Sequence, residues 1–329
     1  MNRSSIYRLF TTVAFTFLTM VVCAQTQHPT QEIEPFYDLN FTTVERDSLM
    51  QGLRDYQRSI EAIHRYQLEN SVPMSLWFDP VPTGFKKETI QKPIDWGLPK
   101  EVKVPANPEE LAFYPVHKLA VLLKSKKITS TQLTKVYLDR LKKFSDTLQC
   151  TVLLLEERAL AQARKTDEEI AKGKYRGPLH GIPYGVKDLL AVAGTKTTWG
   201  AEPYVNQEIK TTATIVKKLD EAGAVLVAKF TLGALAMGDI WFGGVTKNPW
   251  NLKQGSSGSS AGSASATVAG LVAFSIGTET LGSIVSPSTR CGASGLRPTF
   301  GTVSRHGAMA LSWSMDKIGP ICRSAFDAA

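Results

Sequence analysis

Hydrophobic and polar positions along the chain predict one amphipathic helix near the N-terminus. In residues 43–70, apolar residues recur at spacings of four and three and therefore share one face of a helix. These are Leu49, Leu53, Tyr56, Ile60 and Ile63. The stripe is too short for a coiled coil, so we expect it to pack on the main body of the protein.

Prolines interrupt the chain between residues 72 and 108 and exclude regular helix there. We expect an extended strap over the surface. It divides an N-terminal segment, residues 25–110, from a larger domain, residues 111–329.

The larger domain begins with two predicted helices. One covers residues 116–124. The next begins at a capping box, because Thr129 is followed three residues later by Gln132 and then by periodic apolar residues.

Farther along, helix and strand signals alternate. Residues 215–221 predict a helix closed by Gly223, and residues 224–228 predict a buried strand. This order is typical of an α/β protein. Ser324 is a candidate cap for a helix over residues 325–329, which stops before it could finish, so we expect the chain to be a fragment.

Composition indicates a globular protein, with 43% hydrophobic and 21% charged residues. The formal charge of +8 is spread along the sequence instead of forming a basic block. We therefore expect no nucleic-acid partner.

Residues 1–24 resemble a secretory signal peptide. Arg3 and Arg8 precede an apolar run over residues 10–22 and compact residues before Gln25. We expect export to the periplasm or the medium, with no stable membrane span after cleavage. A lipid anchor at Cys23 is less favoured, because no small residue precedes it.

The remaining cysteines and the histidines give no metal signal. Cys150, Cys291 and Cys322 lack the paired spacing of a zinc or redox motif, and buried free thiols are favoured over one disulfide. The five histidines stand apart, so we expect neither metal nor cofactor. His180 is interpreted as a structural or pocket-lining residue.

Residues 255–263 concentrate serine and glycine, and a further serine, Ser283, stands alone in residues 278–284. Hydroxyls and unhindered backbone amides are what an acyl-transfer site needs. A flexible linker is the alternative, but the uncharged, small-residue stretch over 261–273 favours a helix buried against a sheet.

The run also fits a nucleophile elbow with Ser260 as the attacking residue. That motif requires a hydrophobic strand before it and an acid followed by a histidine after it. Residues 248–254 are polar, and His306 precedes Asp316, so the elbow is disfavoured.

Lys187 follows a strand-like segment, residues 182–186, and is a candidate base. On a strand its neighbour Asp188 would point to the opposite face, so the two need not pair. A lysine buried there would lose affinity for its proton. On local sequence alone, a solvated lysine at a strand end is the simpler interpretation.

Five segments together resemble the amidase signature family. They are residues 177–188, the Ser/Gly run over 255–263, residues 277–284, residues 295–299 and residues 316–320. They occur in family order from about residue 115 onward, which is very improbable by chance.

The resemblance implies an α/β fold with a mixed sheet between helices and a Ser-Ser-Lys triad. The family's nucleophile falls on Ser283, its bridging serine after a cis peptide bond on Ser259, and its base on Lys187. The implied oxyanion donors are the backbone N–H groups of Thr280, Leu281, Gly282 and Ser283.

Several positions depart from the family pattern. Ser257 and Ala261 stand where glycines are usual, Leu281 replaces a glycine before the nucleophile, Glu279 replaces an aspartate, and Val285 replaces an arginine. None removes the triad, and we expect them to alter substrate preference more than reaction type.

The resemblance implies an exported amidase that hydrolyses a small linear carboxamide to a carboxylic acid and ammonia or an amine. Alternatives are the glutaminase subunit of a tRNA-dependent amidotransferase, and an inactive scaffold or binding protein. Family domains extend beyond residue 320, so we expect this chain to be C-terminally truncated and poorly stable or inactive. Robust turnover of a simple amide would contradict that expectation.

Overall fold

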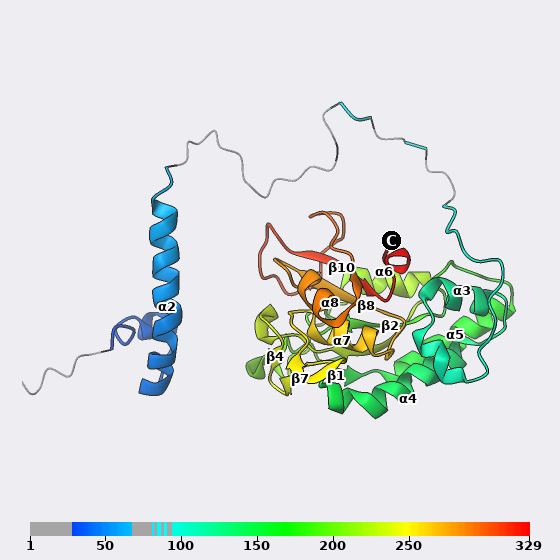
Figure 1. The fold of residues 1–329 in the computed structure, drawn as a ribbon, viewed down its shortest axis with the longest axis horizontal. Coiled ribbons are helices and arrows are strands. Elements are labelled where there is room, and N and C mark those ends of the chain that lie inside the picture. The colour runs from blue at the N-terminus through cyan, green and yellow to red at the C-terminus, as the bar shows by residue number, and fades with distance from the viewer. Residues whose placement is uncertain (1–27, 68–80, 82–83, 87–88, 91–93) are drawn as a thin grey trace, which may run out of the picture. The chain divides into compact units, whose positions relative to one another are not determined.

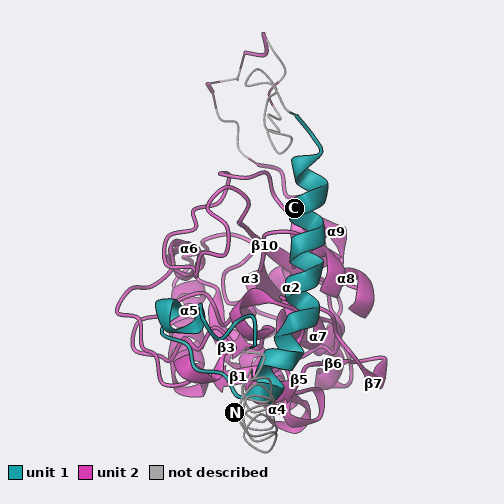
Figure 2. Cartoon of the chain, turned by 90° about the vertical axis from the view of Figure 1, so that its left-hand side faces the viewer, with its two compact units in different colours: residues 1–77 teal, residues 78–329 magenta. Residues whose placement is uncertain are grey.

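The computed structural model describes residues 28–67, 81, 84–86, 89–90 and 94–329, and these residues divide into two units (Figures 1 and 2). Unit 1 ends at Trp77 and unit 2 begins at Phe78. The expected signal peptide, residues 1–24, lies outside the described residues. No described helix is both long and apolar enough to cross a lipid bilayer.

Unit 1 consists of a short 3-10 helix, η1 (Glu34–Tyr37), and α2 (Thr43–His64). Thr42 and Glu45 form a capping box that satisfies the first N–H groups of α2. α2 buries none of its residues, and the expected packing of its apolar stripe stays a prediction.

Unit 2 is built on a six-stranded mixed sheet in the order β1-β3-β2-β8-β10-β9 (Figure 1). The three central strands are parallel, whereas β1 and β10 join them antiparallel. The strands are β1 (Thr151–Leu154), β2 (Pro183–Lys187), β3 (Val225–Phe230), β8 (Phe274–Glu279), β9 (Ser294–Gly295) and β10 (Lys317–Cys322).

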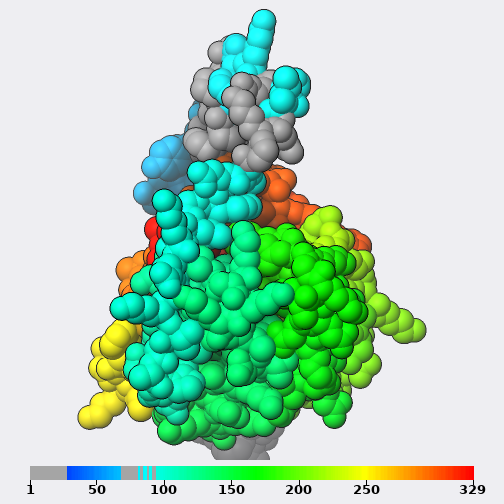
Figure 3. All heavy atoms as spheres, turned by 90° about the vertical axis from the view of Figure 1, so that its right-hand side faces the viewer, coloured from blue at the N-terminus to red at the C-terminus, as the bar shows by residue number. Residues whose placement is uncertain are grey.

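Helices cover the sheet and leave its central strands buried. They are η2 (Pro108–Phe113), α3 (Val116–Lys124), α4 (Ser130–Leu148), α5 (Glu156–Ala171), η3 (Glu202–Tyr204), α6 (Thr214–Ala222), η4 (Ala234–Ala236), α7 (Ala261–Val268), α8 (Val285–Cys291) and α9 (Ala325–Ala328). The surface in Figure 3 is formed largely by the cyan-to-green segment that contains α3 to α5. Two small ribbons lie apart from the main sheet, β4 (Ile240–Trp241) with β5 (Gly244–Val245), and β6 (Lys247–Asn248) with β7 (Asn251–Gly255).

Apolar clusters on the two sides of the sheet hold it in place. One cluster joins α3 and α6 to side chains such as Tyr184 and Ile276. The other joins α4, α5 and α7 to side chains such as Val227 and Phe230. Because each central strand is buried along its whole length, its polar residues need internal partners.

The structure confirms most of the predicted elements. The helix at residues 116–124, the Thr129 capping box of α4 and the closure of α6 at Gly223 are all present. Ser324 caps α9, and the described residues between 81 and 107 contain no helix or strand. Cys150, Cys291 and Cys322 are buried free thiols, as favoured.

One predicted boundary was wrong. The buried helix expected over residues 261–273 ends at Val268. The chain turns at Gly270, where φ is +66°, a conformation that glycine adopts without a Cβ clash. The apolar residues that follow lead into β8.

Candidate active site

Lys187 ends β2 in the middle of the sheet, and its side chain is fully buried. Its Nζ lies 2.7 Å from Ser259 Oγ, 3.0 Å from Thr278 Oγ1 and 3.4 Å from the Thr278 carbonyl oxygen. Among the described residues, no carboxylate forms an ion pair with this amine. The sequence-based alternative of a solvated lysine was therefore wrong.

Burial lowers the pKa of Lys187 to about 7, although the negative charges of Asp316 and Glu279 oppose the shift. A neutral amine has two N–H donors and one lone pair. The Thr278 carbonyl can only accept, and the Thr278 hydroxyl can accept the second hydrogen. The lone pair is then left for the hydroxyl hydrogen of Ser259.

Asp188 points away from Lys187, as its position on the strand predicted. It forms a fully buried ion pair with Lys229 of β3, with 2.7 Å between Oδ1 and Nζ. Its other oxygen accepts hydrogen bonds from the backbone N–H and the hydroxyl of Thr198. The carboxylate next to Lys187 in the sequence is thereby committed to another lysine.

Ser259 lies in the loop between β7 and α7, and its peptide bond with Gly258 is cis. That is the geometry that the resemblance implies for the bridging serine. A Cβ at Gly258 would lie 1.8 Å from the carbonyl oxygen of Gly238, so this position has no room for a side chain.

Ser283 lies between β8 and α8 and is 8% exposed. Its carbonyl accepts a hydrogen bond of 3.0 Å from the backbone N–H of Ser260, which ties the loop of Ser259 to the loop of Ser283. Within the described part of the chain, the structure records no hydrogen bond between the two hydroxyls. It thus joins Lys187 to Ser259 directly and brings Ser283 beside them through the backbone.

The predicted oxyanion loop is organised by Glu279. Its carboxylate accepts the N–H groups of Ile284 at 2.8 Å and Val285 at 2.9 Å. Burial raises the pKa of Glu279, but these donors, the N–H of Gly282 and the nearby Arg297 together lower it below its ordinary value. Glu279 is therefore an anion that fixes the start of α8.

Of the four predicted oxyanion donors, the Gly282 N–H is already directed at Glu279. No hydrogen bond is recorded in the described structure for the N–H groups of Thr280, Leu281 and Ser283. Gly282 takes the left-handed conformation, with φ +83°, so the loop turns there and not at Leu281. Leu281 therefore fits the loop backbone without strain.

A cavity of about 360 Å³ opens beside these groups. Ser259, Thr278 and Thr280 line it together with residues 305–311, Trp313 and Asp316. This volume lies within the range of ligand pockets, about 300–1,000 Å³. The site therefore has room for a small organic substrate next to Ser259 and the start of the oxyanion loop.

Sequence reasoning missed two residues of this site. Thr278 holds Lys187 through both its hydroxyl and its carbonyl, and Asp316 accepts the Thr280 hydroxyl at 2.5 Å. Both belong to segments that carried the family resemblance. Only the three-dimensional pairing reveals their contacts.

Two other candidates have structural partners. The hydroxyl of Ser260, the disfavoured elbow nucleophile, is buried and bonds both the carbonyl and the N–H of Thr278. His180 is buried and hydrogen-bonds Glu169, with 3.1 Å between Nε2 and the carboxylate. No group of three or more potential metal ligands occurs among the described residues.

Comparison with known proteins identifies the family. Residues 132–329 match the family model described as Amidase, and the chain belongs to this family. The chain is 39% identical over 223 residues to a glutamyl-tRNA(Gln) amidotransferase subunit of Carboxydothermus hydrogenoformans, covering 67% of this chain and 46% of the relative. For the corresponding Coxiella burnetii protein the identity is 42% over 211 residues, covering 63% and 43%.

Solved amidase structures share the fold. The native peptide amidase of Stenotrophomonas maltophilia is 37% identical with a TM-score of 0.63, covering 68% of this chain and 47% of that protein. Fatty acid amide hydrolase is 28% identical with a TM-score of 0.64, covering 68% and 41%. The chain thus spans somewhat less than half the length of these relatives.

Proposed function

We propose that this protein hydrolyses a carboxamide through Lys187, Ser259 and Ser283. The observation that carries the proposal is the buried Lys187 amine, which lies 2.7 Å from Ser259 Oγ and forms no ion pair with a carboxylate in the described part of the chain. An amine with a pKa of about 7 is about half neutral at pH 7, and the neutral half can accept a proton. Membership of the Amidase family supports this assignment.

In the proposed reaction, Lys187 accepts the hydroxyl proton of Ser259, which in turn takes the proton of Ser283. Ser283 Oγ then forms a bond with the amide carbon, and the carbonyl oxygen becomes an oxyanion. In this reaction the backbone N–H groups of Thr280, Leu281 and Ser283 stabilise that charge. The Ser259–Ser283 proton transfer requires the two hydroxyls to come within hydrogen-bond distance when substrate binds.

Collapse of the intermediate breaks the C–N bond. The leaving nitrogen takes the proton held by Lys187, relayed through Ser259, and departs as ammonia or an amine. Water then attacks the acyl ester on Ser283, with the same amine as base, and releases the carboxylic acid.

Labelling with a small fluorophosphonate tests this assignment. Ser283 Oγ would bond to phosphorus and expel fluoride, adding a fixed mass to the intact protein. We expect labelling of the wild type, none in Ser283→Ala, and strongly reduced labelling in Lys187→Met. Folded protein without labelling would contradict the proposal and favour the scaffold or binding alternative.

A second candidate is a glutaminase that supplies ammonia to a tRNA-dependent amidotransferase. The identity to the two amidotransferase subunits supports it. Comparison of glutamine with simple carboxamides as substrates separates the two functions, because strict preference for glutamine would favour the glutaminase. A hydrolase that accepts other amides equally well would contradict it.

We also propose that the protein is exported through residues 1–24. The basic residues and apolar run of that segment support export. Cell fractionation with N-terminal sequencing of the mature protein tests it, and we expect a new N-terminus at Gln25. Retention of residues 1–24 on cytosolic protein would contradict export and would favour the amidotransferase alternative, since that enzyme works beside translation in the cytosol.

A further inference from the structure

The charged side chains that line the cavity are engaged with the protein itself. Asp316 accepts the Thr280 hydroxyl on one oxygen and the backbone N–H groups of Leu311 and Ser312 on the other. Lys317 donates to the Thr280 carbonyl at 3.0 Å. These two groups hold the cavity wall against the oxyanion loop, and both carboxylate oxygens of Asp316 already have donors from the protein.

Arg305 is also held in place by the protein. It donates a long hydrogen bond of 3.4 Å to the Ser312 carbonyl, and its guanidinium lies 4.9 Å from the centre of the Phe300 ring. His306, the remaining titratable residue of the lining, has its backbone N–H bonded to the Ser304 hydroxyl. Within the described structure, Asp316 thus has donors on both oxygens, whereas Arg305 and Lys317 each donate to one backbone carbonyl and form no ion pair.

The apolar side chains of the same region are exposed instead. Trp313 and Leu311 line the cavity and are 80% and 48% exposed. Leu281, two residues before Ser283, is 81% exposed. When a ligand covers large apolar groups that are exposed to water at a reaction site, the free energy of binding becomes more favourable.

A second exposed apolar residue, Met237, follows a residue of the cavity lining in the sequence. Ala236 lines the cavity, Met237 is 74% exposed, and the Gly238 carbonyl packs against Gly258. The Ser257 and Ser286 hydroxyls are 2.7 Å apart, which joins the loop of Ser259 to the first turn of α8. Exposed apolar residues thus occur both next to Gly238, whose carbonyl approaches Gly258, and two residues before Ser283.

We propose that this site takes amides with an apolar group next to the scissile bond, and that Leu281 and Trp313 determine this specificity. The inference rests on the proposed function, because it places the substrate on Ser283, two residues from Leu281. The loop turns at Gly282, so the backbone conformation at position 281 does not require a particular side chain. Its side chain is therefore free to contact the substrate.

Two fluorophosphonates of equal reactivity test the inference on the full chain. One carries a methyl group and the other a branched or aromatic apolar group. Labelling rates are measured by intact mass. We expect the apolar probe to react at least about tenfold faster with the wild type, because even a few buried methylenes give discrimination of that size.

Leu281→Ala and Trp313→Ala should each lower the apolar-to-methyl rate ratio by about three- to tenfold. Leu281→Met keeps the apolar volume, and its apolar-to-methyl rate ratio should be close to that of the wild type. Leu252→Ala is the matched control, since Leu252 is a leucine of β7 that is 47% exposed and lies outside both the oxyanion loop and the cavity lining, and it should leave both rates unchanged. Circular dichroism establishes that each variant is folded.

The outcomes separate the two proposals. If the methyl probe labels Ser283 but the ratio is near one, or is unchanged in both alanine variants, the specificity inference is wrong while the proposed function stands. Faster labelling by an anionic probe would also overturn the inference and point to Arg305. If neither probe labels folded protein, the proposed function fails and the inference fails with it.

Discussion

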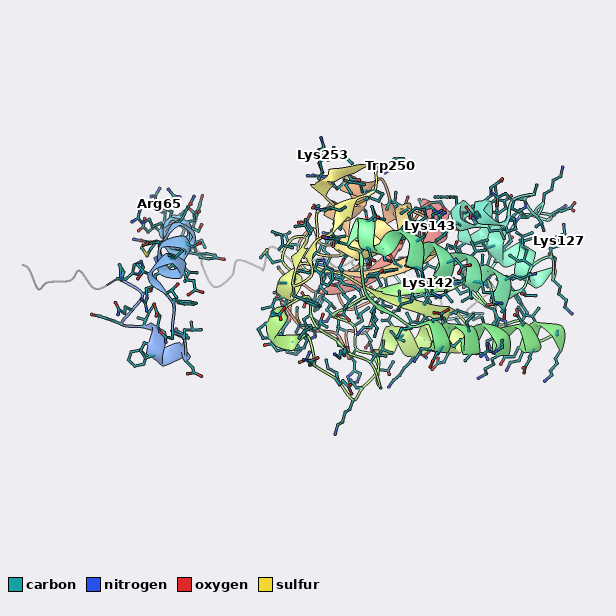
Figure 4. The ribbon with its side chains drawn as sticks, turned by 90° about the horizontal axis from the view of Figure 1, so that it is seen from below. Arg65, Lys127, Lys142, Lys143, Trp250 and Lys253 are labelled. Atoms are coloured by element: carbon teal, nitrogen blue, oxygen red, sulfur yellow. The ribbon has the colours of Figure 1, made fainter. Side chains whose placement is uncertain are left out.

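Two lysines on neighbouring strands share the same degree of burial but differ in their partners. Lys187 ends β2 and Lys229 lies beside it on β3, where it is paired in register with Val186. Both side chains are fully buried, whereas Lys253 lies at an outer edge of unit 2 (Figure 4). Lys229 contacts the Asp188 carboxylate at 2.7 Å, and Lys187 contacts only hydroxyl and carbonyl oxygens.

This difference shows that the partner, and not burial alone, decides what a buried lysine does. Burial lowers the pKa of both amines. For Lys229 the charge of Asp188 opposes that shift and favours the ammonium form. Among the described residues Lys187 has no such ion pair, and its amine is suited to accept a proton. Lys229 instead joins β3 to Asp188 after β2 and to the loop at Lys196 and Thr197.

Removal of the Lys187 amine should have the largest effect. We expect Lys187→Met to reduce the rate of probe labelling or amide hydrolysis by about 10³- to 10⁴-fold, because the base is lost. The free energy of unfolding should not fall, since a methionine fills the site without a buried amine. Lys253→Met is the control and should behave as the wild type. More than a tenth of wild-type activity in folded Lys187→Met would exclude a base role for this residue.

Breaking the Asp188–Lys229 ion pair should lower the stability of the fold more directly than the activity. We expect Asp188→Asn or Lys229→Met to lower the free energy of unfolding by about 3–5 kcal/mol, because each leaves a buried charge without its partner. Urea denaturation followed by circular dichroism measures the effect. The double variant Asp188→Asn/Lys229→Met should lose less than the sum of the two single variants. Additive losses would show that the ion pair does not act as a unit.

The contrast between the lysines also shows how far sequence reasoning reaches. Strand alternation predicted that Asp188 would turn away from Lys187, and the family segments predicted where the serines stand. The sequence could not identify Lys229 as the partner of Asp188. Asp188 and Lys229 are 41 positions apart and meet only through the parallel register of β2 and β3. Thr278 was missed for the same reason, since β8 reaches Lys187 only once the sheet has formed.

The fold was predictable where local signals act alone and less so where tertiary contacts compete. Capping at Thr129 and Ser324 and closure at Gly223 depend on neighbouring residues, and all three were found. The helix after Ser260 was predicted too long, because an uncharged run is compatible with both a helix and a strand. There the turn at Gly270 and the pairing of β8 with β2 decide the structure.

The pH dependence of stability should distinguish the lysines further. The pKa of Lys187 is about 7 in the folded protein and 10.5 in a free lysine, so between these values the unfolded chain binds one more proton than the folded one. The free energy of unfolding should therefore rise with pH by up to about 1.4 kcal/mol per unit through this residue. Between pH 7.5 and 9.5, the wild type should gain about 2–3 kcal/mol relative to Lys187→Met. Parallel curves for the two proteins would show that Lys187 keeps its ordinary pKa.

The smallest effect is expected at Thr278, whose hydroxyl orients the Lys187 amine without touching the substrate bond. Thr278→Val removes one acceptor 3.0 Å from Nζ and keeps the backbone carbonyl and the side-chain shape. The wild-type labelling rate should rise with pH through a midpoint near 7, because only the neutral amine is a base. In Thr278→Val the plateau should fall about tenfold, a loss near that of one buried hydrogen bond to a charged or reacting group. The midpoint should move to lower pH, because the ammonium form loses an acceptor. Thr278→Ser keeps the hydroxyl and should restore both the plateau and the midpoint. A lower plateau with an unchanged midpoint in Thr278→Val would mean that Thr278 supports the loop but does not position the amine.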